Sequence, residues 1–248
     1  MELLGIDIGG SGIKGAVVNA DTGVLVSERF RLPTPRPSHP EKVAGIVCEL
    51  INHFNYSGPV GATFPAIIKN GKCLTASNIH GDWQGTQVDE LFAKHCNQQF
   101  FVLNDADAAG EAEMKFGAGK DKNGLVITIT VGTGLGSGVF FNGELIPNIE
   151  LGVIYGKDGK KIEHYAADSA RKREDLSFRK WAKRLNFYLN HIELVMNPDL
   201  IIIGGGVSKK MEKLEEFLDV NVPIVPAVNQ NNAGIIGAAM YALDKVKS

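Results

Sequence analysis

The sequence predicts an α/β fold of two lobes, and three observations support this prediction. The chain has 248 residues, which is long enough for two packed lobes. Residues 2–32 and 124–146 each contain a glycine-rich turn between short strand patterns. After each of these segments, apolar strand patterns alternate with helical ones. This repetition indicates an internal duplication, with an N-terminal lobe over 1–106, a C-terminal lobe over 107–232 and a final helix, about 233–248, that returns to the first lobe.

The first half opens with three strand patterns, ELLGIDIG, IKGAVVNA and GVLVSERFRL, which are separated by turns at Gly9-Gly10 and at Asp21-Thr22-Gly23. A proline-rich segment and a helical pattern from about Glu41 to Phe54 follow. Next come a strand in GPVGATFPAII, a helix in VDELFAKHC, a strand in QFFVLND and a small-residue helix in ADAAGEAEMKFGAG. One face of the first helix is predicted to be buried, namely Val43, Ile46, Val47, Leu50 and Ile51.

The second half repeats this order of elements. GLVITITVGTGLGSGVFFNGELI predicts strand, glycine turn, strand, turn and strand. PDLIIIGGGVSKK predicts a buried strand that leads through a glycine turn into a helix, and NNAGIIGAAMYALDKV predicts the last helix. The segment LSFRKWAKRLNFYLNHIELVM predicts a strong amphipathic helix, with apolar residues at Phe178, Trp181, Leu185, Tyr188, Leu189, Ile192 and Val195.

Composition and charge favour a soluble cytoplasmic protein. The formal net charge of −2 gives no reason to expect nucleic acid or an anionic membrane as a partner. The start lacks a basic region followed by an apolar one, and no apolar run reaches the length of a membrane span. Cys48, Cys73 and Cys96 are far apart and have no metal-ligand spacing, so we expect free, buried thiols in a reducing compartment.

Three glycine turns carry the functional prediction: DIGGSGIKG, TVGTGLGSG and IIIGGGVSKK. Glycine lets the backbone approach a polyanion closely, and phosphoryl transfer needs donors on both sides of the phosphate chain. Any one of these turns is also compatible with an ordinary hairpin tip. All three in one chain favour phosphate binding.

These turns, together with NDADAAGEAE and NAGIIGAAM, resemble the ROK family of the actin-like sugar-kinase superfamily. Within that family the similarity is closest to the polyphosphate glucokinases, through GSGIKGA, TFPA, NDADAAGEAEMKFGAG, LGSGVF, WAKRL and PDLIIIGGGVSKK. The resemblance covers nearly the whole chain. It implies the actin-like, ribonuclease H-like ATPase fold, with two lobes that each hold a mixed sheet flanked by helices, and an active-site cleft between them. It also implies transfer of a phosphoryl group to the 6-hydroxyl of glucose from polyphosphate, and from ATP as a further donor.

The resemblance assigns Asp105 as the catalytic base and Asn104 as a sugar-binding residue. A carboxylate that accepts the hydroxyl proton typically contributes a factor of 10²–10⁴ to the rate. From the residues alone, Asn104-Asp105 is also a common helix N-cap, and Asp107 is an alternative cap. Glu111 and Glu113 are interpreted as packing or surface residues. Asp7 matches the family's aspartate that positions Mg²⁺, often through water.

The remaining predicted site residues contact the donor or the sugar. Lys14 either neutralises phosphate or faces solvent, and Thr133 offers a hydroxyl to phosphate. The phosphate-donor residues are Gly9, Gly10, Ser11, Gly12, Lys14, Gly132, Thr133, Gly134, Gly205, Gly206 and Lys209. The sugar residues are Thr63, Pro65, Asn78, Asn104, Asp105 and Glu150.

The sequence departs from the family pattern beside Glu150. The family motif E-x-G-H reads ELGV here, so Val153 replaces a histidine that hydrogen-bonds the sugar. The loss of a polar anchor is expected to relax specificity or weaken binding. His164 is a candidate substitute, although a lone histidine is more often structural. No cysteine follows Cys96, so we expect none of the family's structural zinc.

Residues 157–184 contain ten Lys or Arg and five Asp or Glu, and this excess favours a track for polyphosphate. The alternative is a solvated basic helix face. The family implies a homodimer, for which the helix over 178–195 is a candidate surface, although its apolar stripe is equally compatible with a core. Donor preference and the hexose, with mannose, fructose or an amino sugar as alternatives, stay open. A sugar binder without turnover also stays open, whereas the early start of the first strand leaves no room for a repressor's DNA-binding segment.

Overall fold

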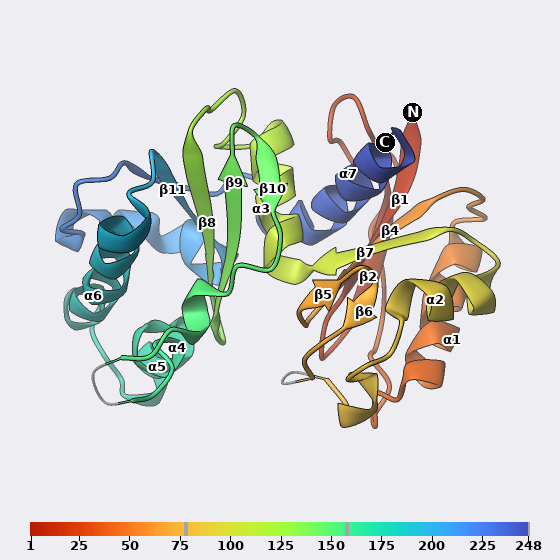
Figure 1. The fold of residues 1–248 in the computed structure, drawn as a ribbon, viewed down its shortest axis with the longest axis horizontal. Coiled ribbons are helices and arrows are strands. Elements are labelled where there is room, and N and C mark those ends of the chain that lie inside the picture. The colour runs from red at the N-terminus through yellow and green to blue at the C-terminus, as the bar shows by residue number, and fades with distance from the viewer. Residues whose placement is uncertain (77–78, 157–158, 248) are drawn as a thin grey trace. The chain divides into compact units, whose positions relative to one another are not determined.

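The computed structural model of the chain describes residues 1–76, 79–156 and 159–247. Within these residues, no helix has both the length and the apolar character that a membrane crossing requires. The chain forms two compact units (Figure 1). Unit 1 comprises residues 1–115 and 232–248, and unit 2 comprises residues 116–231. The sequence predicts the first boundary at residue 106, near the start of the helix Asp105–Phe116. In the structure unit 1 continues to Lys115 and includes nearly all of this helix.

Unit 1 is built on a five-stranded mixed sheet. Its strands are β1 (Glu2–Ile8), β2 (Ile13–Asn19), β3 (Phe30–Leu32), β4 (Val60–Phe64) and β7 (Phe100–Asn104). They lie in the order β3-β2-β1-β4-β7. β2 pairs antiparallel with β1 and β3, whereas β1, β4 and β7 run parallel. A separate small sheet pairs β5 (Ile68–Lys69) with β6 (Lys72–Cys73).

Helices cover both faces of this sheet (Figure 1). α1 (Pro40–His53) and α2 (Val88–Cys96) join the core formed by Leu4, Ile6 and Ile8. α7 (Ala233–Lys247) packs on the opposite face, against β1 and β4, and α3 (Asp105–Phe116) continues directly from β7. A β-carbon at Gly61 would overlap the backbone of Ala238, so α7 approaches the sheet closely only because β4 has no side chain there.

Two expectations about unit 1 are wrong. The third predicted strand shrinks to Phe30–Leu32, because the backbone N–H of Val17 donates to the Ser27 hydroxyl and Leu25 makes only an isolated bridge to Val18. Cys48 and Cys96 are not free thiols but form a disulfide that links α1 to α2. They are 48 residues apart in sequence, yet the packing of the two helices brings their Cα atoms to 5.0 Å. Cys73 is free and buried, as the sequence predicts.

Unit 2 repeats the sheet topology of unit 1. Its strands are β8 (Leu125–Val131), β9 (Leu135–Phe141), β10 (Glu144–Ile146), β11 (Leu200–Gly204) and β12 (Ile224–Pro226). Their order is β10-β9-β8-β11-β12, with antiparallel β8-β9-β10 and parallel β8-β11-β12. Two sheets with the same order and the same strand directions are what a duplicated unit produces.

Helical segments complete unit 2. Its α-helices are α4 (Glu163–Ala166), α5 (Asp168–Arg173) and α6 (Phe178–Met196). The aromatic stripe of α6 is largely core, since Trp181, Leu185 and Tyr188 are buried, whereas Val195 is exposed. The segment after β11 is a 3₁₀ helix, η3 (Gly205–Lys213). The other 3₁₀ segments of the described chain are η1 (Gly81–Trp83), η2 (Leu151–Val153), η4 (Glu215–Phe217) and η5 (Gln230–Asn232).

Candidate active site

The sheet of unit 1 brings three predicted site residues to one edge. Asp7 pairs in register with Thr63, and the next residue of β4, Phe64, pairs with Asn104. Because β1, β4 and β7 are parallel, their carboxyl ends meet at the same edge, and neighbouring strands lie about 4.8 Å apart. Ligands in open α/β sheets bind at such carboxyl edges. The structure thus gathers Asp7, Thr63 and Asn104 where a ligand site is expected.

Asp7 is held on three sides. Its Oδ2 atom lies 2.9 Å from the Nζ atom of Lys14, and its Oδ1 atom accepts a hydrogen bond of 2.9 Å from the Thr63 hydroxyl. A β-carbon at Gly234 would touch the same carboxylate, so Asp7 also faces the first turn of α7. Lys14 therefore pairs with a carboxylate. The sequence predicted instead that Lys14 either neutralises phosphate or faces solvent.

The first glycine turn connects β1 to β2. The Gly9 N–H donates to the Gly12 carbonyl at 3.0 Å and closes the turn. Two side chains from the β3 region hold it from outside: Arg31 Nη2 donates to the Ser11 carbonyl at 2.8 Å, and the Thr34 hydroxyl donates to the Gly9 carbonyl. Gly10 and Ser11 are exposed at the tip. The turn thus presents backbone to solvent beside a guanidinium group.

Asn104 and Asp105 differ in their surroundings: Asn104 caps a helix, and Asp105 is exposed. Asn104 is buried, and its Oδ1 atom accepts hydrogen bonds from the backbone N–H groups of Ala106 and Asp107, at 2.7 and 3.2 Å. Its Nδ2 atom donates to the Ala66 carbonyl at 3.1 Å. These bonds cap α3 in the manner of an N-cap residue. Asp105 is the first residue of the helix and is exposed, so its carboxylate is accessible at the sheet edge.

Pro65 and three buried acids of α3 complete the described part of unit 1 around this edge. Pro65 follows β4 in a tight turn in which the Ala66 N–H donates to the Phe64 carbonyl at 2.8 Å. The Asn104 amide bonds this same turn through Ala66. Asn78, predicted to contact the sugar, lies outside the described residues. Asp107, Glu111 and Glu113 are buried on α3, so the two glutamates are not surface residues.

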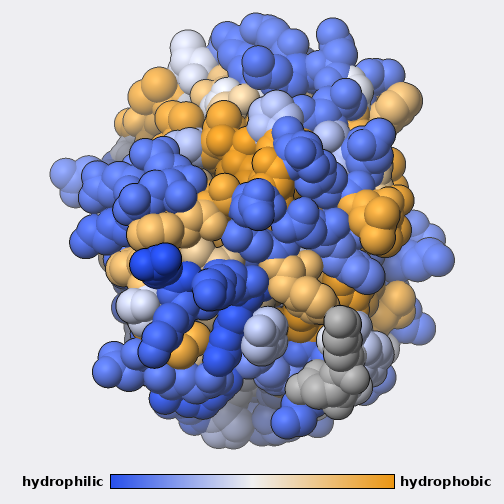
Figure 2. Space-filling view, turned by 90° about the vertical axis from the view of Figure 1, so that its left-hand side faces the viewer, coloured by the Kyte–Doolittle hydropathy of each residue, from blue (hydrophilic) through white to orange (hydrophobic). Residues whose placement is uncertain are grey.

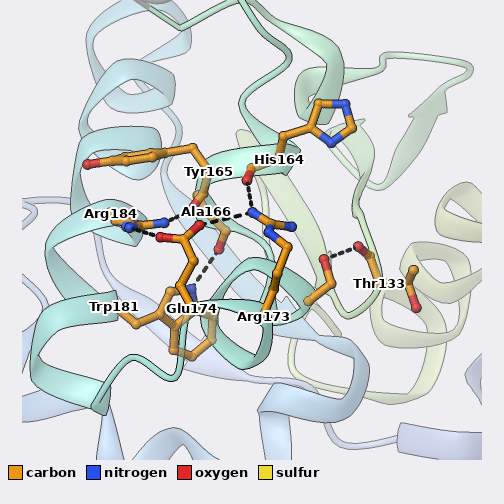
Figure 3. Close-up of polar contacts among 9 residues, drawn as sticks. Thr133, His164, Tyr165, Ala166, Arg173, Glu174, Trp181 and Arg184 are labelled. Atoms are coloured by element: carbon orange, nitrogen blue, oxygen red, sulfur yellow. Dashed lines mark hydrogen bonds and ion pairs between the residues drawn. The ribbon is translucent and has the colours of Figure 1, made fainter.

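The second glycine turn, Gly132 to Gly134, joins β8 to β9 and is fixed by α5. The Ser169 N–H donates to the Gly132 carbonyl at 3.1 Å, and the Ser169 hydroxyl donates to the Thr133 carbonyl at 2.6 Å (Figure 3). Thr133 itself is exposed. The carbonyl groups of this turn are therefore occupied by protein donors, while its tip stays accessible.

The third turn lies directly beside the second. β11 pairs with β8 up to the register Gly204 with Thr130, and Gly205 follows in the left-handed region with φ of 73°. A β-carbon at Gly205 would overlap the Val131 backbone, so glycine is required there for both conformation and space. Gly206 and Lys209 are exposed on η3. Unit 2 thus brings the second and third turns together.

Glu150 belongs to a pair of carboxylates in unit 2. Burial raises the pKa of Glu150, as does the nearby Glu163, while Lys161 partly opposes the shift. Glu163 also lies against the second turn, because its Oε2 atom would contact a β-carbon at Gly134. Tyr188 is fully buried close to both glutamates, and burial followed by their charges raises the pKa of its hydroxyl.

The position that departs from the family pattern is partly exposed. Val153 ends η2 and keeps 36% of its surface accessible, so it contributes an apolar side chain next to Glu150. His164 lies beside Glu163 in sequence. Its backbone carbonyl accepts from Arg173 at 2.8 Å, whereas its ring points away from that contact (Figure 3).

Some Lys and Arg residues of the basic segment, residues 157–184, form ion pairs, and three others are exposed on α6. Asp168 pairs with Arg171 and Lys172, and Glu174 pairs with Arg173 and Arg184 (Figure 3). The hydrogen bond from Arg184 is the main cause that lowers the pKa of Glu174 to about 2. Arg179, Lys180 and Lys183 are exposed on α6. The surface on this side of the molecule is strongly hydrophilic with apolar patches (Figure 2).

Comparison with known proteins decides the family. The family model described as "ROK family" matches residues 3–148, which is more than half of the chain. The chain belongs to the ROK family. A polyphosphate glucokinase of Mycobacterium tuberculosis (strain CDC 1551 / Oshkosh) is 47% identical over 96% of this chain and 90% of its own length. The polyphosphate glucokinase of Mycobacterium leprae (strain TN) is 45% identical over 95% of this chain and 73% of its own length.

Solved structures of ROK proteins agree with the fold. The inorganic polyphosphate/ATP-glucomannokinase from Arthrobacter sp. strain KM superposes with a TM-score of 0.92, at 43% identity, over 98% of this chain and 99% of that one. A ROK family glucokinase from Streptomyces griseus in complex with glucose and AMPPNP gives a TM-score of 0.82 at 24% identity, over 98% of this chain and 100% of that one. The predicted actin-like α/β fold, with two mixed sheets flanked by helices, is confirmed.

Three residues near the ROK motifs were missed by the sequence analysis. Arg31 contacts the first turn, Ser169 holds the second, and Glu163 lies between the second turn and Glu150. Arg31 pairs with Lys14 across β2 and β3, so the hairpin register was a usable signal for it. Ser169 and Glu163 are more than 25 residues beyond Gly134, and no local pattern marks them.

Proposed function

We propose that this ROK protein is a polyphosphate-dependent hexokinase that transfers a phosphoryl group to the 6-hydroxyl of glucose. The observation that carries the proposal is the position of Asp105, exposed at the start of α3, at the sheet edge that also holds Asp7 and Thr63. The polyphosphate glucokinase relatives at 45–47% identity support the choice of donor and sugar. ATP is proposed as a second donor, since the Arthrobacter structure is described as using both.

In this mechanism Asp105 is the general base. Its carboxylate accepts the proton of the sugar 6-hydroxyl while that oxygen forms its bond to phosphorus and the bond to the donor's bridging oxygen breaks. Asn104 positions this carboxylate, because its side chain caps α3 and ties the helix to the turn after β4. One N–H of its amide is left over from these bonds for a sugar hydroxyl. The remaining sugar contacts are assigned to Thr63, Pro65, Asn78 and Glu150.

Mg²⁺ fits the residues around Asp7 through water. Lys14 and Thr63 each contact one carboxylate oxygen, so direct ligation would compete with both, whereas Mg²⁺ keeps most of its waters and needs few protein carboxylates. Asp7 would hold the hydrated ion, with the Thr63 hydroxyl fixing its orientation. When bound, Mg²⁺ neutralises charge that develops on the phosphate oxygens.

The donor is assigned to the three turns. The amides of the turn from Gly9 to Gly12 and of the turn from Gly132 to Gly134 bind phosphate oxygens, and Gly205, Gly206 and Lys209 extend this contact. Arg179, Lys180 and Lys183 on α6 are assigned to the distal part of a polyphosphate chain, which carries a charge at every unit.

Mannose is a second candidate substrate. Val153 removes the hydrogen bond that the family's histidine makes to the sugar, so a site of relaxed specificity is expected. The Arthrobacter relative is described as a glucomannokinase. Kinetics with glucose, mannose, fructose and glucosamine, each with polyphosphate and with ATP, separate these candidates. Sugar binding by calorimetry without turnover on either donor would instead indicate a binding protein.

A cytoplasmic homodimer is proposed as the working form. Phe187, Leu194 and Val195 are exposed apolar residues on α6, and such residues are suited to a contact between copies. In a reducing compartment Cys48 and Cys96 would be thiols. The Cys48–Cys96 disulfide would then form only after the protein is exposed to an oxidant.

The variant Asp105→Asn tests the proposed chemistry. Because the amide cannot accept the proton, kcat should fall by a factor of about 10²–10⁴ with polyphosphate and with ATP. Glucose binding measured by calorimetry should persist, since the carboxamide keeps the shape of the side chain. Asp21→Asn, a change in an exposed turn of the same unit, is the matched control and should keep normal turnover. Near-normal turnover of Asp105→Asn would end the assignment of this residue as the base.

A further inference from the structure

A cluster of two histidines and an aspartate lies in unit 1, outside the candidate active site. His39 immediately precedes α1, while His80 and Asp82 lie at η1, over 40 residues later in the chain. The Nδ1 atoms of His39 and His80 lie 2.8 and 3.4 Å from the same atom, Oδ2 of Asp82. One possible ligand atom from each of the three residues falls within 4.8 Å of the others.

These separations suit ligands of a single transition-metal ion. Zinc binds histidine nitrogen and carboxylate oxygen at about 2.0–2.2 Å, so two such ligands lie roughly 2.9 Å apart at a right angle and roughly 3.3 Å apart at the tetrahedral angle. The two distances to Asp82 are close to these values. The shorter one is a direct hydrogen bond between His39 and Asp82, and His80 Nδ1 accepts from the Asp82 N–H at 3.3 Å, so a bound ion would replace these bonds. Two imidazoles and one carboxylate favour Zn²⁺, Co²⁺ or Ni²⁺ over Mg²⁺ or Ca²⁺, which prefer oxygen ligands only.

The backbone around the cluster is fixed before any ion binds. The indole N–H of Trp83 donates to the Ser38 carbonyl at 2.8 Å, and the His80 N–H donates to the Ser38 hydroxyl at 3.3 Å. Trp83 is fully buried, and its ring packs on Phe64 with centroids 4.5 Å apart. Pro40 occupies the first turn of α1 and restricts the backbone of His39. The backbone positions of both histidines are therefore fixed by neighbouring contacts, and their rings lie 4.0 Å apart, centroid to centroid.

We propose that His39, His80 and Asp82 bind one divalent transition-metal ion, with Zn²⁺ as the committed occupant. The side chains are partly exposed, which leaves room for water as a further ligand. The ion joins the segment before α1 to η1 and so stabilises unit 1. It is separate from the family's cysteine-based zinc motif, which this sequence lacks.

Titration of the untagged protein with Zn²⁺ in a calorimeter tests the proposal, with Co²⁺ absorption in the visible region as a report on the ligands. We expect one equivalent to bind. His39→Ala and His80→Ala should each weaken binding by at least about 100-fold, since even the loss of an outer-shell partner costs 10–100-fold. Asp82→Asn tests the carboxylate with little change in shape. His191→Ala, an exposed histidine on α6, is the matched control and should bind normally.

Zn²⁺ should also raise the melting temperature of the parent protein and of His191→Ala, but not that of His39→Ala or His80→Ala. Circular dichroism in the absence of metal checks that these variants fold. The proposal is overturned if the parent protein binds no Zn²⁺, or if His39→Ala and His80→Ala bind as the parent does. Loss of binding in His191→Ala alone would place the ion elsewhere. Each result is independent of kinase turnover, so the proposed function can fail while this site stands.

Discussion

Asn104 and Asp105 are neighbours in sequence but differ in what surrounds them. Asn104 is 6% exposed and bonds the backbone of α3 and of the turn after β4, whereas Asp105 is exposed one position later. The sequence left N-cap and catalytic base as rival interpretations of this pair. In the structure Asn104 is the N-cap residue of α3. Asp105 is the first residue of this helix, whose start is fixed by the Asn104 hydrogen bonds. A base benefits from such a rigid support, because proton transfer requires hydrogen-bond distance.

Glu150 is a candidate site residue whose ionised form is disfavoured by its surroundings. Burial and Glu163 both raise its pKa, so the folded state holds the proton more tightly than the unfolded state does. The stability that this provides is full below the unfolded pKa, about 4.5, and is lost as the pH rises through the raised value. Once the pH exceeds this raised pKa, the ionised Glu150 therefore destabilises unit 2. A sugar that donates hydrogen bonds to the carboxylate would offset this cost.

Glu150→Gln separates the two effects at this residue. The variant should melt at a higher temperature than the parent at pH 7, and the difference should shrink toward zero as the pH falls to about 4. Because the amide is a weaker acceptor of sugar hydroxyls, the KM for glucose should rise by about tenfold. Thermal unfolding across this pH range and steady-state kinetics give both quantities. Glu144→Gln, an exposed change in β10, should alter neither, and a pH-independent difference for Glu150→Gln would refute the explanation.

At the scale of elements, the contact between α7 and the first sheet decides how the C-terminal segment returns to unit 1. Gly5 and Gly61 face α7 from adjacent strands, and a β-carbon at either would overlap its backbone. Small residues dominate the buried part of α7, among them Ala238 and Ala239. The helix therefore lies nearly backbone to backbone on the sheet. This packing also directs the first turn of α7 toward Asp7.

Gly61→Ala should destabilise the protein by about 1–3 kcal/mol, because overpacking at a close contact moves the backbone. Gly45→Ala is the matched control. Gly45 lies within α1 with open space around its β-carbon position, so alanine there should stabilise by about 0.5–1 kcal/mol. Urea unfolding monitored by tryptophan fluorescence and circular dichroism measures both. Equal free energies of unfolding for the two variants would show that α7 does not pack as described.

At the scale of the whole molecule, charge is distributed unevenly although the net charge is only −2. Four cations of the basic segment form ion pairs with Asp168 and Glu174. The exposed cations Arg179, Lys180 and Lys183 on α6 are the ones assigned to polyphosphate. A long polyanion gathers several weak contacts along its length, whereas ATP is too short to do so.

Replacing Arg179, Lys180 and Lys183 with glutamine should raise the KM for long-chain polyphosphate by about tenfold, if each exposed contact contributes about 0.5 kcal/mol. The KM values for ATP and glucose should stay unchanged. The dependence of the polyphosphate KM on salt should become shallower, because fewer charges interact. Lys42, Lys69 and Lys94 are exposed on unit 1, and their replacement by glutamine makes the same change in net charge as a control. Equal effects of both triple variants would refute a specific track on α6.

The sequence alone determined the repeated pattern of elements, the three glycine turns and the position of Asp105, because these depend on local periodicity and on residues close together in the chain. The ends of α2 and α6 follow from such local signals. Only the tertiary structure decided the Cys48–Cys96 disulfide, the pairing of Lys14 with Asp7, and the placement of Glu163 and Ser169 at the second turn. The Lys14–Asp7 pair depends on the register of the β1–β2 hairpin. The disulfide and the placement of Glu163 and Ser169 depend on how separate elements pack, and residue spacing along the chain carries no information about distances across a core.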